Sequence, residues 1–95
     1  MPAVVRLGDV STGHPDGYPS RPSTGGSPDV YVNGKKAHRV GDSWATHSNG
    51  DHSHGGSASS GSSNIFVNGK ALCRVGDKIS CGDTMATGSP NVIAN

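Results

Sequence analysis

Candidate metal ligands follow the three Arg-x-Gly-Asp motifs of this 95-residue chain at nearly equal distances. His14 and His47 each lie five residues after the aspartate of the first and second motifs, and Cys81 lies four residues after the aspartate of the third motif. Imidazole and thiolate groups are ligands that zinc binds in proteins. In a threefold arrangement, side chains at equivalent positions are equally far from the axis and converge on one point. The spacing therefore predicts a metal centre built from His14, His47 and Cys81.

A fourth ligand on or near the axis would complete a tetrahedral site. Only the segment after the second Arg-x-Gly-Asp motif carries further histidines, His52 and His54, and the spacing alone leaves both open. We favour His54 because it precedes Gly55-Gly56, as a ligand would precede a tight turn. The predicted metal ligands are then His14, His47, His54 and Cys81.

A mixed imidazole and thiolate set suits Zn²⁺, and a site closed by four protein ligands is structural rather than catalytic. A zinc hydrolase needs an open coordination position and usually a general base such as glutamate, but all seven acidic residues are aspartates. A nucleophile pair of Cys81 with His14 or His47 is the other catalytic alternative, but a four-ligand site would use that thiolate on the metal. We therefore predict a structural zinc ion, no catalytic residues and no enzyme activity.

The candidate ligands follow copies of a 17-residue repeat, read first at residues 26–42 as GSPDVYVNGKKAHRVGD and again at 61–77 as GSSNIFVNGKALCRVGD. A third copy is divided between the chain ends, with residues 88–95 supplying its first half and residues 1–9 its second half. Three equivalent units whose ends meet imply a closed, roughly threefold object. The two termini are therefore expected to lie close together.

Each intact repeat contains an apolar alternation, an Asn-Gly turn signal and a returning strand, which predict hairpins over residues 29–40 and 64–75. Because isolated hairpins are marginally stable, three of them must share one small core. The predicted fold is all-β: a small cone-like, pseudo-threefold arrangement of three β-hairpins, the third closed by the N- and C-terminal strands. Irregular loops are expected over residues 10–25, 43–60 and 78–87.

Repeat position also assigns packing roles. His38 and Cys73 share the position of Val5 in the divided copy, so we expect them to pack rather than to bind metal. The recurring Arg-x-Gly-Asp predicts an ion-paired hairpin corner whose glycine needs a positive φ. Two apolar sets alternate along the strands, and one of them is Tyr31, Phe66 and Ile93. The pattern does not decide which set faces the axis.

Composition narrows the class of protein. The length fits one small domain, residues 1–95. A core this poor in large apolar side chains needs an additional cross-link, such as a bound metal ion. A net charge of +1 without a basic run predicts no nucleic-acid binding. No stretch is long enough to span a bilayer and no signal peptide is evident, so we expect synthesis in a cytoplasm. A disulfide between Cys73 and Cys81 is less favoured than a ligand role for Cys81.

The repeats resemble the PAAR (Pro-Ala-Ala-Arg) repeat family. The resemblance rests on PAVVRLGD at 2–9, KAHRVGD at 36–42 and KALCRVGD at 70–77, and on Gly-Ser-Pro-x-Val at 26–30 and 88–92. Only the divided copy keeps the opening Pro-Ala of the name motif, at Pro2-Ala3, so the match lies in the repeat architecture. The resemblance covers nearly the whole chain, so no effector or toxin extension is expected.

The resemblance implies a cone that caps the trimeric β-helical spike of a contractile injection machine, either a bacteriophage tail or a type VI secretion system. It implies one copy bound to a homotrimeric spike protein, entry into the target envelope during piercing, and delivery into the target cell from a virion or secretion spike. It also implies a zinc ion near the vertex held by three histidines and one cysteine, here His14, His47, His54 and Cys81. An adaptor that attaches effectors to the spike is the alternative function.

Overall fold

The computed structural model describes residues 2–13 and 17–95, and this part of the chain is all-β, without a helix. Its principal extents are 37 × 24 × 23 Å, which is one long axis and two similar short ones. The strands form three two-stranded antiparallel sheets. These sheets are β1 (Tyr31–Val32) with β2 (Lys35–Lys36), β3 (Ser43–Ser48) with β4 (Ser53–Ser57), and β5 (Phe66–Val67) with β6 (Lys70–Ala71).

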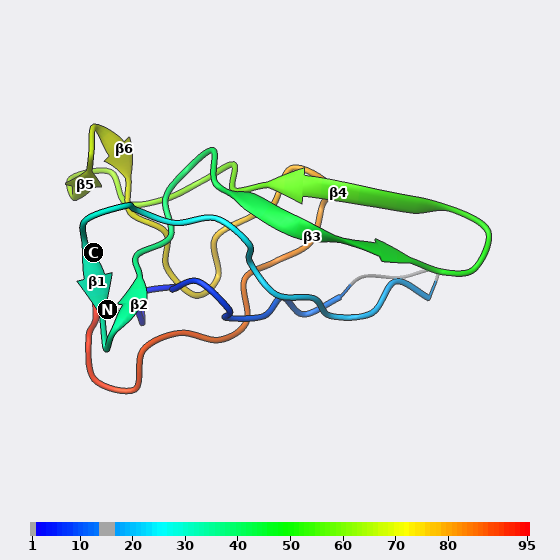
Figure 1. The fold of residues 1–95 in the computed structure, drawn as a ribbon, viewed down its shortest axis with the longest axis horizontal. Coiled ribbons are helices and arrows are strands. Elements are labelled where there is room, and N and C mark those ends of the chain that lie inside the picture. The colour runs from blue at the N-terminus through cyan, green and yellow to red at the C-terminus, as the bar shows by residue number, and fades with distance from the viewer. Residues whose placement is uncertain (1, 14–16) are drawn as a thin grey trace.

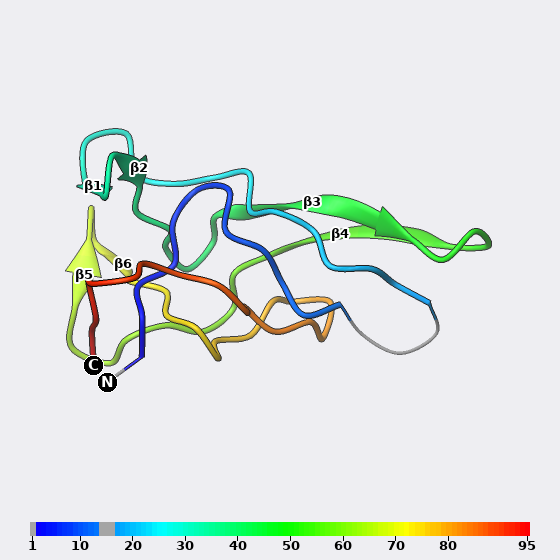
Figure 2. The ribbon, with the colours of Figure 1, turned by 90° about the horizontal axis from the view of Figure 1, so that it is seen from below.

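The chain ends complete the third hairpin, as the divided repeat predicts. Ala3 and Ile93 form an antiparallel bridge, and the Ala94 N–H donates to the Pro2 carbonyl over 3.0 Å. Figures 1 and 2 place this pair of segments at the same end of the molecule as β1, β2, β5 and β6. We call this end, formed by the three hairpins, the base. Met1 lies outside the described residues.

Both intact hairpins turn at the expected Asn-Gly pairs. Asn33 and Asn68 each have a φ of 55°, and Gly34 and Gly69 follow with φ of 77° and 78°. Two successive residues with positive φ define the type I′ turn, which Asn-Gly adopts at the lowest steric cost. The sequence signal and the backbone therefore agree at both positions.

A closed ring of backbone hydrogen bonds marks the pseudo-threefold axis. The Val5 N–H donates to the Cys73 carbonyl over 3.0 Å, Cys73 donates to His38 over 2.9 Å, and His38 donates to Val5 over 3.0 Å. All three residues have an exposed fraction of 0%. One residue from each repeat thus meets at the centre, which confirms the threefold architecture and the packing role of this position.

The predicted hairpins are longer than those observed. The strands of the intact repeats span only residues 31–36 and 66–71 with their turns, because the chain beyond each turn pairs with a neighbouring repeat. Those exchanges are the antiparallel bridges between Arg6 and Ala37, Arg39 and Leu72, and Val4 and Arg74. The exchange of partners is what links the three hairpins into one body.

Part of the segment 43–60, predicted as an irregular loop, is instead the longest hairpin of the fold, β3–β4. Its pairing runs from Ser43 opposite Ser57 to Ser48 opposite Ser53, with a register shift between Trp44 and His47. A bulge adds one residue to one strand, so Trp44 and His47, three residues apart, are both buried. Figure 1 shows this hairpin extending away from the base.

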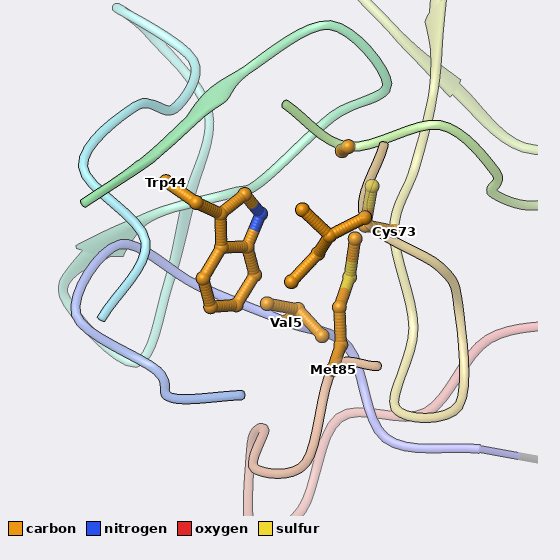
Figure 3. Packing of buried hydrophobic residues seen from close by; sticks show 6 residues of the cluster. Val5, Trp44, Cys73 and Met85 are labelled. Carbon is orange, nitrogen blue, oxygen red and sulfur yellow. The ribbon is translucent and has the colours of Figure 1, made fainter. Parts of the chain in front are cut away.

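The apolar core consists of two small clusters. The cluster shown in Figure 3 surrounds the axis and contains Val5, Trp44, Ala58, Cys73, Ile79 and Met85. The other is made of Val4, Ala37, Val67, Leu72 and Ala94, residues that precede or follow the hairpin turns. Tyr31, Phe66 and Ile93 are 55%, 60% and 57% exposed, so this apolar set does not face the axis.

Each repeat ends in an ion-paired corner, as the recurring Arg-x-Gly-Asp predicts. In the repeat at residues 26–42 the Arg39 backbone N–H and side-chain Nε both donate to Asp42 Oδ2 over 2.8 Å, and Nη2 donates to Oδ1 over 2.9 Å. Gly41 between them has a φ of 95°, a conformation that glycine adopts without strain. The same pairs join Arg6 to Asp9 and Arg74 to Asp77.

The buried His38 gives the fold a dependence on pH. Burial lowers the pKa of His38 from 6.5, and the hydrogen bond between Nδ1 and the Gly25 carbonyl opposes this only in part. Between pH 6.5 and the lower pKa of the folded state, the unfolded chain therefore binds a proton at His38 more readily than the folded chain does. The free energy of unfolding should be constant above pH 6.5 on this account and fall as the pH drops below it, by at most about 1.4 kcal/mol per pH unit.

We expect His38→Val, which copies Val5 of the divided repeat, to remove this slope. Urea unfolding of both proteins at pH 7.5, 6.0 and 5.0 measures it, and the difference between them isolates His38 from the other histidines. An equal slope in wild type and His38→Val would contradict the prediction.

Candidate metal centre

Three of the four predicted ligands converge in the structure. His47 on β3 and His54 on β4 are directly opposite one another, and their Nε2 atoms lie 2.7 Å apart. Cys81 enters from a tight turn in which the Gly82 N–H donates to the Ile79 carbonyl over 2.9 Å. The ligand atoms of His47, His54 and Cys81 all lie within 4.8 Å of one another. The β3–β4 hairpin and a turn far from it in sequence thus present two imidazole nitrogens and one sulfur to one point.

His47 is held in the tautomer that a metal ligand needs. The residue is 4% exposed, and its Nδ1 lies 2.8 Å from the Pro19 carbonyl oxygen. Because a carbonyl only accepts, the neutral ring carries its proton on Nδ1, which leaves the lone pair on Nε2 facing the cluster. A second interaction that fixes a histidine in this way is usual at metal sites. The donor set therefore fits a divalent metal ion.

The aromatic ring of Tyr18 covers the two histidines. Its centroid lies 4.9 Å from that of His47 and 4.4 Å from that of His54, and the two imidazoles meet edge to face at 4.5 Å. The ring limits how far either imidazole can rotate. The sequence offers no signal for this contact, because Tyr18 lies in a Pro- and Gly-rich segment without periodicity.

The cluster does not include His52 or Cys73. His14 is outside the described residues. His52 is exposed in the turn of the β3–β4 hairpin, where its backbone N–H donates to Asn49 Oδ1 over 2.8 Å. Both cysteines are free thiols. Burial raises the pKa of the Cys73 thiol to about 12, so this residue is an inert part of the core.

A family model described as the PAAR motif matches residues 12–87, which is more than half of the chain. The chain belongs to the PAAR-motif family. Proteins with this motif form the spike tip of contractile injection systems. A comparison with curated proteins finds no match. No helix in the described ranges has the length and apolar character needed to cross a membrane.

In this PAAR protein the candidate metal ligands His47, His54 and Cys81 lie between the axial core and the turn of the β3–β4 hairpin. Trp44, at the core, and His47, at the cluster, come from the same strand. Ile79 and Cys81 likewise come from one turn, two residues apart. The cluster thus continues the packed core toward the end opposite the base, where few apolar side chains are available.

Proposed function

We propose that residues 1–95 form one PAAR-repeat domain that caps and sharpens a trimeric β-helical spike and helps it pierce a target envelope. The observation that carries the proposal is the axial ring of Val5, His38 and Cys73, together with the family match. A single chain with three similar edges can meet a homotrimer by matching its symmetry. In this role the chain is a binding and piercing module, not an enzyme. It is made in a bacterial cytoplasm and acts at a phage tail tip or a type VI secretion spike.

The base offers the surface for this contact. Tyr31, Phe66 and Ile93 occupy equivalent positions of the three repeats and are each more than half exposed. Exposed aromatic and aliphatic side chains at one end of a small domain favour a partner surface over solvent. A homotrimer would present three identical apolar sites, one to each of these side chains.

The proposed metal is Zn²⁺ held by His47, His54 and Cys81, with His14 as the fourth ligand. A bound ion would supply folding energy that this small core lacks. His47 and His54 tie the two strands of the hairpin together, and Cys81 ties that hairpin to the turn after the third corner. A tip held by such cross-links resists separation of its segments when force acts along the long axis.

The test is reconstitution with the trimeric spike protein of the same genome, followed by mass determination of the purified complex by light scattering. We expect one chain per trimer. Three chains per trimer, or no complex, would overturn the capping proposal. Metal content is measured separately by elemental analysis, so the two parts of the proposal can fail independently.

Phe66→Asp should weaken the contact with the spike. The charge would be desolvated against an apolar partner, and an anchor residue of this kind contributes at least about 2 kcal/mol, or about thirtyfold in Kd. Isothermal titration against the spike trimer measures the change. His52→Asp, which places the same charge in the hairpin turn away from the base, should bind like the wild type. Equal Kd values for the two variants would contradict a contact through the base.

A further inference from the structure

A buried arginine lies against the sulfur of the metal cluster. Arg21 is 3% exposed, and its Nη2 lies 2.9 Å from Cys81 Sγ. An arginine has only donors, so the sulfur accepts this hydrogen bond. The backbone of Arg21 is fixed by Ser11, which donates from its N–H to the Arg21 carbonyl over 2.9 Å. The contact is therefore part of the folded core.

The pseudo-threefold repeat explains why there is room for this guanidinium. Ser23, Ala58 and Met85 form equivalent bridges with Trp44, Ile79 and Ser11, so the residues two places earlier are also equivalent. Those residues are Arg21, Gly56 and Asp83. A Cβ at Gly56 would lie 3.3 Å from Arg21 Nη2 and 2.9 Å from Ile79 Cγ2. The glycine thus leaves the space on the axis that the guanidinium occupies.

The guanidinium lies closer to the Cys81 sulfur than to the carboxylate of Asp83. Arg21 Nε lies 4.0 Å from Asp83 Oδ2, and neither atom has a hydrogen-bond partner in the described part of the chain. Asp83 Oδ1 instead accepts from Thr12 Oγ1 over 2.9 Å and from the Thr84 N–H over 2.8 Å. The aspartate balances the buried charge, while the short hydrogen bond goes to Cys81.

We propose that Arg21 is a positioning residue of the metal centre, which donates a hydrogen bond to the Cys81 sulfur and retains it when the metal is bound. The inference rests on the proposed metal site. A hydrogen bond to a coordinated thiolate draws electron density from sulfur and fixes its direction, and removal of such partners costs about 10- to 100-fold in metal affinity. Arg21 would also compensate the negative charge of the thiolate inside the core.

Cobalt(II)-substituted protein tests the proposal, because the sulfur-to-cobalt charge-transfer band reports electron donation by the thiolate. In Arg21→Met and Arg21→Gln the band should move to longer wavelength, and competition with a chromophoric chelator should show about tenfold weaker cobalt binding. Arg74→Met, the same change at an arginine away from the cluster, should leave band and affinity unchanged.

Either folded Arg21 variant with the wild-type band position and affinity would overturn the role of Arg21. If the wild-type protein binds no cobalt or shows no thiolate band, the metal site itself fails, and this inference fails with it. A loss of thermal stability without a shift of the band would indicate that Arg21 only packs the core, and would also overturn the proposal.

Discussion

Replacing His54 with alanine is expected to remove the metal ion and to lower the free energy of unfolding by more than about 4 kcal/mol, a loss typical of a structural metal. His54 pairs with His47 across β3–β4, and its Nε2 lies 2.7 Å from the Nε2 of His47. For a domain of this size the midpoint of thermal unfolding should fall by roughly 20 °C. Calorimetry together with elemental analysis measures both effects.

His52→Ala is the matched control, because it removes an imidazole from the same hairpin only two residues away. His52 is exposed in the hairpin turn, so this variant should keep its metal and its midpoint. A chelator should lower the midpoint of wild type and His52→Ala alike, and have no effect on His54→Ala. If metal content followed His52 instead of His54, or if chelation changed nothing in the wild type, the proposed ligand set would be wrong.

The sequence predicted the parts of the fold in which the repeat carries strong local signals. The turns at Asn33-Gly34 and Asn68-Gly69 require positive φ, and few residue pairs other than Asn-Gly meet that requirement so readily. The Arg-x-Gly-Asp corners are equally local, since each ion pair joins an arginine to the aspartate three residues later. The divided third repeat followed from counting alone.

The sequence pattern did not predict the β3–β4 hairpin, and the reasons are physical. Its strands read SWATHS and SHGGS, which are poor in β-branched residues, and the register shift between Trp44 and His47 breaks the period of two. Tertiary contacts specify it instead, as Trp44 packs in the core and His47 meets His54 and the Pro19 carbonyl. Arg21 was missed for the same reason, because its partner Cys81 is 60 residues away.

Replacing the corner arginine with methionine should lower the free energy of unfolding more at Arg39 than at Arg74. Arg39 reaches the neighbouring hairpin, donating from Nη1 to Asn68 Oδ1 over 3.0 Å, and within its own repeat it donates from Nη2 to the Gly26 carbonyl over 3.3 Å. Arg74 donates only within its own corner among the described residues, and its side chain is 22% exposed against 9% for Arg39. Arg39→Met should therefore cost about 3 kcal/mol of unfolding free energy, as expected for breaking a buried pair. Arg74→Met should cost about 1.5 kcal/mol.

Acid should reduce the difference between Arg39→Met and the wild type. Burial alone would raise the pKa of the Asp42 carboxyl, but hydrogen bonds from the Arg39 side chain and backbone outweigh it and hold the pKa below 3.8. The stability that this pair contributes is present above pH 3.8 and is lost as the pH falls through the lower pKa of the folded state. Urea unfolding at pH 7 and at pH 3 measures the difference. Equal costs for Arg39→Met and Arg74→Met at pH 7 would show that the contact to Asn68 does not stabilise the ring of hairpins.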